Sequence, residues 1–268
     1  DTARNRAAAA RLIRRVKATA YAVVEQLRRG EFGISGTEVE FGTGKRYPEL
    51  ILELPGGGRY ILSGRIDRID SCTSDSGEKF VRVIDYKSKS GSAFDCADIA
   101  DGKRLQLPLY IAAIEAAGAA ERAAGMYYLP VHEGIINSSG KEDDFGARIL
   151  KEFRLRGACL NDAELIELGG GEDVQPTARS GWRLSEEQLK GTVSFAVDKA
   201  RQTACKIAKG HAEAYPLMSK ENKTECEWCD YNSVCGFDAT LPCCKYRRAS
   251  IIKKDDFLEE VSHAQMDR

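Results

Sequence analysis

The chain has 268 residues and a formal net charge of −1, with 43% hydrophobic and 30% charged residues. This composition describes a soluble globular protein of one large domain or two small ones, and it excludes binding of nucleic acid through the charge of the whole molecule. Because no apolar run is long enough to span a bilayer and no secretory signal is present, we expect a cytoplasmic protein with no membrane partner.

Residues 4–29 are predicted to form a helix, which Gly30 ends. Its apolar residues recur on one stripe: Leu12, Val16, Ala20, Val23 and Leu27. Basic residues outnumber acidic ones in this helix, so any attraction for nucleic acid is expected to be local to it, although a solvated helix face is the simpler interpretation. Since the chain begins with Asp1 and not with Met, we expect a fragment of a longer protein.

Strand-like segments follow at residues 37–41, 47–54 and 59–70, separated by turns that contain Gly and Pro. Residues 71–79 are polar and are predicted to form a hairpin loop. Residues 80–87 are rich in aromatic and β-branched side chains, which favour the interior of a sheet. We therefore expect a group of antiparallel strands that ends in a buried one.

The last residues of that buried strand change abruptly to polar chemistry. Asp85 and Lys87 are two residues apart, so their side chains project from the same face of the strand. The preceding strand carries a second carboxylate, Asp67. A surface ion pair is the simpler interpretation of Asp85 and Lys87, and a solvated residue that of Asp67 alone. Together, two carboxylates can hold Mg²⁺ or Mn²⁺, and the lysine can act on a metal-bound water or on phosphate.

Residues 88–101 are expected to form a loop over this site, and residues 105–120 a helix. Gln106 and Tyr110 are four residues apart and share one face of that helix. There, an amide and an aromatic ring can contact a nucleic-acid backbone or brace the site. Residues 125–131 are predicted to form a further strand, because aromatic and β-branched residues dominate them.

The chain is expected to have four parts. A core over residues 1–135 precedes residues 136–183, whose Gly-rich and polar pieces indicate an excursion from the core. Residues 184–218 are predicted to form a long packing helix with Ser185 as its N-cap and acids in its first turn. Residues 219–268 form a cysteine-rich segment and tail.

Three cysteines in this last part, Cys226, Cys229 and Cys235, follow the pattern C-x₂-C-x₅-C. Soft thiolates at this spacing suit zinc or an iron–sulfur cluster, while the alternative is a chance gathering of free cysteines. Zinc normally takes a fourth ligand, and no histidine lies nearby to supply it. The total of nine cysteines is odd, which argues against a disulfide framework and for a reducing compartment.

Three segments in this order and spacing carry a resemblance to a known family: GRIDRID at residues 64–70, VIDYKS at residues 83–88 and LQLPLY at residues 105–110. They resemble the RecB-type branch of the PD-(D/E)xK nuclease superfamily, and within it the nuclease domain of the AddB family of bacterial helicase–nuclease subunits. The resemblance extends from about Glu38 to beyond Cys235. It implies an α/β fold of the restriction-endonuclease type, with a mixed central sheet flanked by helices and a C-terminal cysteine-rich extension.

The resemblance also implies roles for the residues that match the family's motifs. Asp67 and Asp85 would bind Mg²⁺ or Mn²⁺, and the backbone carbonyl of Tyr86 would complete the metal shell. Lys87 would be catalytic. Gln106 and Tyr110 match the QxxxY signature. Glu38 lies in a segment that resembles the family's ExxFG, although an exposed strand carboxylate is its simpler interpretation.

The function that the resemblance implies is that of a metal-dependent DNA exonuclease domain in a helicase–nuclease that processes double-strand breaks for recombinational repair. Its partners would be DNA, as a single strand or a duplex end, and an AddA-like helicase subunit. Two alternatives stay open. The chain could be a DNA-end-binding module that keeps the nuclease fold without activity, or a stand-alone RecB-like exonuclease.

Two departures from the family pattern affect the expected ligands. The cysteine triplet resembles one that ligates a 4Fe–4S cluster together with a fourth cysteine far upstream, but here no cysteine precedes Cys72. We expect either an upstream ligand outside this chain or a local substitute from Cys205, Cys243 or Cys244. A histidine on the helix before the first strand is also absent, and Glu25 is a poor substitute, so that metal ligand too is expected upstream.

Overall fold

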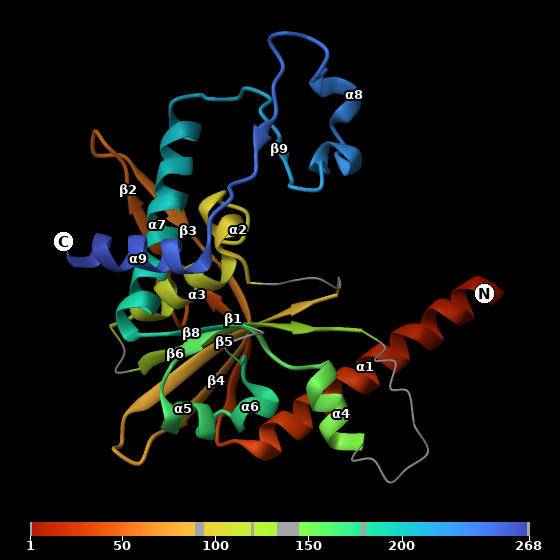
Figure 1. The fold of residues 1–268 in the computed structure, drawn as a ribbon, viewed down its shortest axis with the longest axis vertical. Coiled ribbons are helices and arrows are strands. Elements are labelled where there is room, and N and C mark those ends of the chain that lie inside the picture. Colours follow the sequence, from red (N-terminus) through yellow and green to blue (C-terminus); the bar gives the residue numbers. More distant parts are fainter. Residues whose placement is uncertain (1, 89–93, 119–120, 133–144, 178–180, 267–268) are drawn as a thin grey trace.

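The computed structural model describes residues 2–88, 94–118, 121–132, 145–177 and 181–266 (Figure 1). Across these residues, six strands form one sheet in the order β1-β4-β5-β6-β7-β8. They are β1 (Gly33–Phe41), β4 (Gly64–Thr73), β5 (Lys79–Lys87), β6 (Glu121–Pro130), β7 (Arg156–Leu160) and β8 (Trp182–Leu184). This sheet positions every residue of the predicted metal site.

The sheet mixes parallel and antiparallel neighbours. β4 runs antiparallel to β1 and β5, and β6 runs antiparallel to β7, whereas β5–β6 and β7–β8 are parallel pairs. The central strand β5 contains Val81, Val83 and Ile84, each at most 1% exposed. A continuous apolar run of this kind is typical of a strand that is covered on both faces. The predicted mixed sheet flanked by helices is confirmed.

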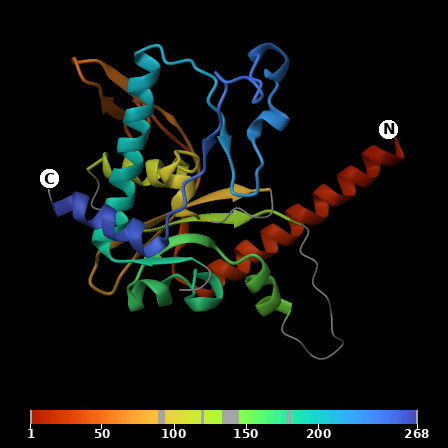
Figure 2. The same cartoon turned by 45° about the horizontal axis from the view of Figure 1, so that its top comes forward.

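Helices cover the two faces of the sheet (Figure 1, Figure 2). One face carries α1 (Ala3–Arg29), α4 (Phe145–Glu152), α5 (Ala163–Leu168) and α6 (Gly171–Val174); the other carries α2 (Cys96–Ala100), α3 (Gln106–Glu115), α7 (Glu186–Ala208) and α9 (Lys254–Met266). The predicted first helix is confirmed, but its buried residues are Thr19, Ala22 and Gln26. Leu12 and Val16 of the apolar stripe are exposed, since the N-terminal half of α1 extends beyond the sheet.

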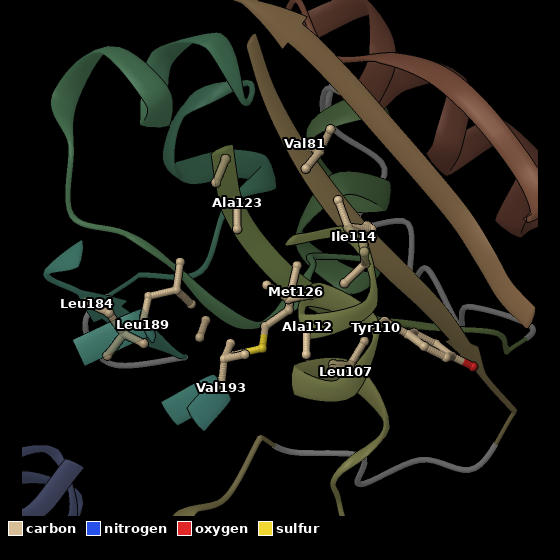
Figure 3. Packing of buried hydrophobic residues seen from close by; sticks show 14 of the residues in the cluster. Val81, Leu107, Tyr110, Ala112, Ile114, Ala123, Met126, Leu184, Leu189 and Val193 are labelled. Atoms are coloured by element: carbon tan, nitrogen blue, oxygen red, sulfur yellow. The ribbon is translucent and has the colours of Figure 1, made fainter. Parts of the chain in front are cut away.

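The main apolar cluster lies between the sheet and the helices α3 and α7 (Figure 3). Leu107 of α3 and Met126 of β6 are fully buried there, and Val193 of α7 is nearly so. Burial of each side chain of this size stabilises the fold by about 1.5–3 kcal/mol. The ring of Tyr110 joins this cluster, while its hydroxyl points away from it (Figure 3). The start of α3 is thereby fixed against the sheet.

The helix α7 begins where the sequence predicts it. The Ser185 hydroxyl accepts a hydrogen bond from the Gln188 N–H, and the Gln188 side chain accepts one from the Ser185 N–H. Such a reciprocal cap satisfies two amides that the first turn leaves free, and it stabilises a helix by about 1 kcal/mol. In the part of the chain that the structure describes, every helix is too short or too polar to cross a membrane.

Several predicted boundaries are wrong. Within residues 136–183, the strands β7 and β8 extend the central sheet, so the described part of this range does not leave the core. The predicted strand over residues 59–70 is two strands, because the chain passes at Ser63 from the small sheet of β3 (Arg59–Leu62) to the central sheet of β4. The expected loop over residues 88–101 contains α2, and residues 89–93 lie outside the described part of the chain.

Two smaller sheets lie outside the central one. β2 (Leu50–Glu53) forms an antiparallel hairpin with β3, and β9 (Leu217–Met218) pairs in parallel with β10 (Arg247–Arg248). Between β9 and β10 lies the cysteine-rich segment, residues 219–246, which contains η1 (Glu225–Trp228) and α8 (Asn232–Cys235). Figure 2 shows this segment at one end of the molecule, apart from the helices that cover the sheet.

Candidate active site

The two predicted metal-binding carboxylates lie on neighbouring strands. Arg68 of β4 is paired with Ile84 of β5, so the antiparallel register continues with Asp67 opposite Asp85. Side chains of directly opposed residues lie on the same face, with their Cβ atoms about 5 Å apart. The Tyr86 N–H donates a hydrogen bond of 3.0 Å to Asp67 Oδ2, which ties this carboxylate to the end of β5. The structure therefore brings Asp67 and Asp85 together.

Asp85 is buried, with 2% of its side chain exposed. Its neighbours have opposite effects on the pKa of its carboxyl. Burial raises the pKa of this carboxyl and the neighbouring charge of Asp67 raises it further, while Lys87 lowers it; the net shift is upward. Lys87 Nζ lies 2.6 Å from Asp85 Oδ2. Oδ2 therefore has the Lys87 ammonium as its partner, and this ion pair is what lowers the pKa of Asp85 against the effect of burial. A buried carboxylate of this kind, compensated only in part, is available to a cation.

A chain of hydrogen bonds leads from Lys87 to the backbone of β4. Lys87 Nζ donates to Gln106 Oε1 over 3.1 Å, and Gln106 Nε2 donates to the Tyr110 hydroxyl over 2.6 Å. The hydroxyl in turn donates to the Arg65 carbonyl over 2.8 Å. The first turn of α3 therefore holds the ammonium of Lys87 beside Asp85. These hydrogen bonds are the ones expected if Gln106 and Tyr110 brace the site, and their contact with nucleic acid stays a prediction.

Glu38 lies on β1 in the same row as the two aspartates. Its neighbours in β1 pair with Arg68 and Ile66, which sets Glu38 opposite Asp67. Its φ of 53° is in the left-handed region, where a residue with a side chain costs about 1–2 kcal/mol. The carboxylate is exposed and lies 2.6 Å from Arg65 Nε, so the expected exposed strand carboxylate is what the structure shows.

A polar cleft of about 240 Å³ opens beside Lys87. Lys103 and Arg104 line it from the loop between α2 and α3, and Tyr128 lines it from β6. Sequence reasoning missed these three residues. Arg104 could have been found from the sequence, because it lies two residues before Gln106. Tyr128 could be found only from the parallel pairing of β6 with β5, which sets it beside Asp85.

The residues at the strand ends fit a hard divalent cation. Asp67 and Asp85 supply carboxylate oxygens, and the buried Asp85 is compensated only in part by Lys87, since its pKa is raised on balance. The N–H and C=O of one strand residue face the same neighbouring strand, so the Tyr86 carbonyl faces β4 as its N–H does. Magnesium is commonly held by one or two carboxylates, with waters and substrate oxygens completing its shell. No third acidic, histidine or cysteine side chain joins the pair among the described residues.

The predicted cysteine ligands are not gathered into a site. Cys226 lies on η1, Cys229 directly after it and Cys235 on α8, and the last two are exposed. Cys243 Sγ is 3.9 Å from Cys244 Sγ, but in the described part of the chain no three metal-ligating side chains converge. As they are placed, these cysteines do not fit an iron–sulfur cluster or a zinc site.

Comparisons with known proteins agree with this geometry. The model of the PD-(D/E)XK nuclease superfamily matches residues 1–236. Bacterial proteins whose names describe a subunit of an ATP-dependent helicase/deoxyribonuclease are similar to the chain. The one from Moorella thermoacetica is 34% identical over 86% of this chain and 22% of its own length. The one from Caldanaerobacter subterraneus is 30% identical over 92% of this chain and 23% of its own length.

The chain spans less than a quarter of the length of these relatives. Among solved structures, SSO0001 aligns over 81% of this chain and 67% of its own, with 15% identity and a TM-score of 0.30. The family match covers most of the chain, including both strands that carry the carboxylates and the helix that begins at Gln106. The chain therefore belongs to the PD-(D/E)XK nuclease superfamily.

Proposed function

We propose that this chain is the nuclease domain of a helicase–nuclease subunit and that it hydrolyses DNA phosphodiester bonds with the help of Mg²⁺ or Mn²⁺. The observation that carries the proposal is the group formed by Asp67, Asp85 and Lys87. Two opposed carboxylates lie near the ends of two paired strands, and the buried one of them, Asp85, is paired with the Lys87 ammonium at 2.6 Å.

Each residue of the group has a role that its surroundings support. Asp67, Asp85 and the Tyr86 carbonyl would hold the cation, which when bound acts as a Lewis acid and lowers the pKa of a coordinated water. Lys87, with its ammonium 2.6 Å from Asp85, would stabilise the charge that develops on the phosphate or orient the attacking water. Gln106 and Tyr110 would position Lys87 through their hydrogen bonds.

The biological setting follows from the relatives. Their name joins a helicase to a deoxyribonuclease. We therefore propose for this chain an exonuclease role in processing double-strand breaks for recombinational repair, with a helicase subunit as partner. The cysteine triplet takes part in no step of this proposal.

A DNA-binding module without activity is the second candidate. It would keep the fold and the cleft beside Lys87 but would not cleave. The complete set of Asp67, Asp85 and Lys87 argues against it, because a site released from catalysis would not be expected to retain all three. A stand-alone exonuclease is disfavoured because the names of the relatives describe a subunit of a larger enzyme.

The test is degradation of linear single-stranded DNA by the chain with Mg²⁺ or Mn²⁺, beside the Lys87→Ala and Asp85→Ala variants. We expect cleavage by the wild type and its loss in both variants. Lys190→Ala is the matched control, because Lys190 is an exposed lysine of α7 that pairs with Glu186, away from the site. Retained cleavage in Asp85→Ala would refute the assignment. A wild type that binds DNA without cleaving it would favour the binding module.

A further inference from the structure

The cleft beside Lys87 has walls from separate parts of the chain. Lys87 closes it at the end of β5, Lys103 and Arg104 come from the loop before α3, and Glu225 comes from the cysteine-rich segment. Asp98 of α2 and Tyr128 of β6 also line the cleft. Because Lys87 also lies 2.6 Å from Asp85, the cleft is continuous with the proposed catalytic centre.

Two of the cations of this cleft, Lys103 and Arg104, lie beside one carboxylate, that of Asp98. Arg104 Nε donates to Asp98 Oδ2 over 2.6 Å, and Lys103 Nζ lies 3.9 Å from Asp98 Oδ1. The guanidinium carbon of Arg104 is 5.7 Å from the ring centroid of Tyr128, and Lys87 Nζ is 5.4 Å from the same centroid. An arginine oriented by an acid on one edge and a ring on another loses little freedom when it binds an anion.

The charge in the cleft selects the kind of ligand. Lys87, Lys103 and Arg104 line the cleft with Asp98 and Glu225, while Asp85 pairs with Lys87 at its end. Asp98 in turn pairs with Arg104, and Lys103 lies farther from it, so its ammonium is the least compensated of the three cations. The chain as a whole has a net charge of −1, so three cationic side chains around one cleft are a local feature. Arginine and lysine around a polar cleft beside a phosphodiester-cleaving centre suit a second phosphate.

We propose that Lys103 and Arg104 bind the phosphate of the DNA strand that neighbours the scissile one. This inference rests on the proposed function, since it takes the Asp85–Lys87 end of the cleft as the place of cleavage. The subsite binds backbone and reads no base, so it fixes the register of the strand relative to the catalytic centre.

Substitution of Glu225 is expected to change DNA affinity in the opposite direction to substitution of Lys103 or Arg104. The Glu225 carboxylate lines the same cleft from the cysteine-rich segment, where it repels a bound phosphate. Glu225→Gln is therefore expected to strengthen DNA binding, whereas Arg104→Ala and Lys103→Ala are expected to weaken it. A role of this cleft in stability alone would not give opposite effects on affinity.

Affinity is measured without metal, so that the result does not depend on cleavage. A fluorescently labelled single-stranded oligonucleotide is titrated in EDTA at several salt concentrations. We expect Arg104→Ala to bind about tenfold more weakly, as for loss of a charged hydrogen bond, with a salt slope smaller by about 1. Arg122→Ala is the matched control. Arg122 also pairs with acids, Glu78 and Glu186, but it lies at the start of β6, at the other end of the strand from Tyr128.

A substrate change locates the contact. One methylphosphonate linkage, which is uncharged, is placed in turn at each phosphate beside the scissile one. At one of these positions the wild type should lose affinity while Arg104→Ala loses none, since the contact is already absent. Equal losses in both proteins at every position, or wild-type affinity in Arg104→Ala and Lys103→Ala, would overturn the subsite. If the wild type binds but never cleaves, the proposed function fails while the subsite is still decided by these titrations.

Discussion

Among single residues, Asp85 shows most clearly how function and stability conflict at this site. Its carboxylate is buried, faces Asp67 and is only partly compensated by Lys87, so its pKa is raised. In the absence of a cation, an ionised carboxylate in such a place favours the unfolded chain, where water solvates it. A divalent cation bound at the strand ends would remove that penalty. The unfavourable burial of Asp85 is therefore what we expect of a metal-binding residue.

We predict that Asp85→Asn abolishes metal-dependent cleavage and raises the melting temperature at neutral pH. A carboxyl with a raised folded pKa contributes stability below its unfolded pKa of about 3.9 and loses it as the pH rises through the folded value. Asparagine does not titrate, so the variant gains on the wild type across that window. Thermal melts from pH 4 to pH 7 measure the difference.

The same variant tests the cation directly. Added Mg²⁺ should raise the melting temperature of the wild type, because a ligand that binds only the folded state stabilises it. It should leave Asp85→Asn unchanged. A variant that is less stable than the wild type at pH 7, or that responds equally to Mg²⁺, would contradict this account of Asp85.

A second prediction concerns Tyr110 as a positioning residue. In Tyr110→Phe, the Gln106 side-chain amide loses the hydroxyl to which it donates. Gln106 is then less well oriented to accept the hydrogen bond from Lys87. We expect kcat to fall about three- to tenfold, the cost of about one hydrogen bond, while KM stays near its wild-type value. Tyr47→Phe is the control, since the Tyr47 hydroxyl donates to Glu121 outside the site. Equal effects of the two variants would indicate a purely structural role.

The residues of the proposed site differ in how well the sequence predicts them. Asp85, Lys87 and Gln106 belong to short local patterns, in which strand and helix periodicity alone decides what shares a face. Arg104 and Tyr128 do not, because Arg104 lies in a loop and Tyr128 approaches only through the β5–β6 pairing. Non-local pairing is what the sequence leaves undetermined at this site.

The elements of the sheet show the same limit. β5 is predicted with the correct end, because its apolar run is continuous and its polar end abrupt. β8 is only three residues long, and its partner β7 is separated from it by two short helices. Strands this short owe their existence to the sheet that they join, and local propensity therefore suggests an excursion where the structure has two strands.

The pairing of β4 with β5 contains a buried group of charges on the face opposite Asp67. Arg68 donates to both oxygens of Asp70 over 2.6 Å, and Arg82 Nε donates to Asp70 Oδ2 over 3.0 Å. All three side chains are at most 1% exposed. Since one carboxylate binds both buried guanidinium groups, we expect the pairing of these strands to depend on Asp70.

We predict that Asp70→Asn destabilises the chain by about 3–5 kcal/mol, because it leaves two buried arginines without a charged partner. Urea unfolding measures the loss. Glu78→Gln is the control. Glu78 pairs with Arg122 at 2.9 Å but is about half exposed, so its loss should cost at most about 1 kcal/mol. Equal losses of unfolding free energy in the two variants would show that the buried Arg68–Asp70–Arg82 group contributes no more to stability than an exposed ion pair.

For the molecule as a whole, the question is how the cysteine-rich segment relates to the nuclease core. Its flanking strands β9 and β10 pair with each other, and the chain after β10 is held at α2, where the Ser250 hydroxyl donates to Asp101 Oδ1 over 2.7 Å. The segment itself carries exposed aromatic side chains, with Trp228 at 84% and Tyr231 at 73%. It is therefore anchored at its ends and little packed in between.

This arrangement predicts that the core does not depend on the cysteine triplet in the isolated chain. Cys229 and Cys235 are exposed and Cys226 is half-buried, so replacing all three by serine should change the free energy of unfolding by at most about 0.5 kcal/mol. Cys159→Ser is the matched control. Cys159 is 3% exposed in β7, and its burial raises the pKa of the thiol to about 11, so a hydroxyl there should cost about 1–3 kcal/mol.

Metal analysis completes the comparison. Because the three thiols are not gathered and lack a fourth ligand among the described residues, the purified chain should contain iron and zinc well below one equivalent. Stoichiometric iron with visible absorbance, lost together with stability in the triple variant but not in Cys159→Ser, would contradict this. Such a result would mean that a bound cluster draws the cysteines together, and the cleft wall at Glu225 would then be set by that cluster, since Glu225 directly precedes Cys226.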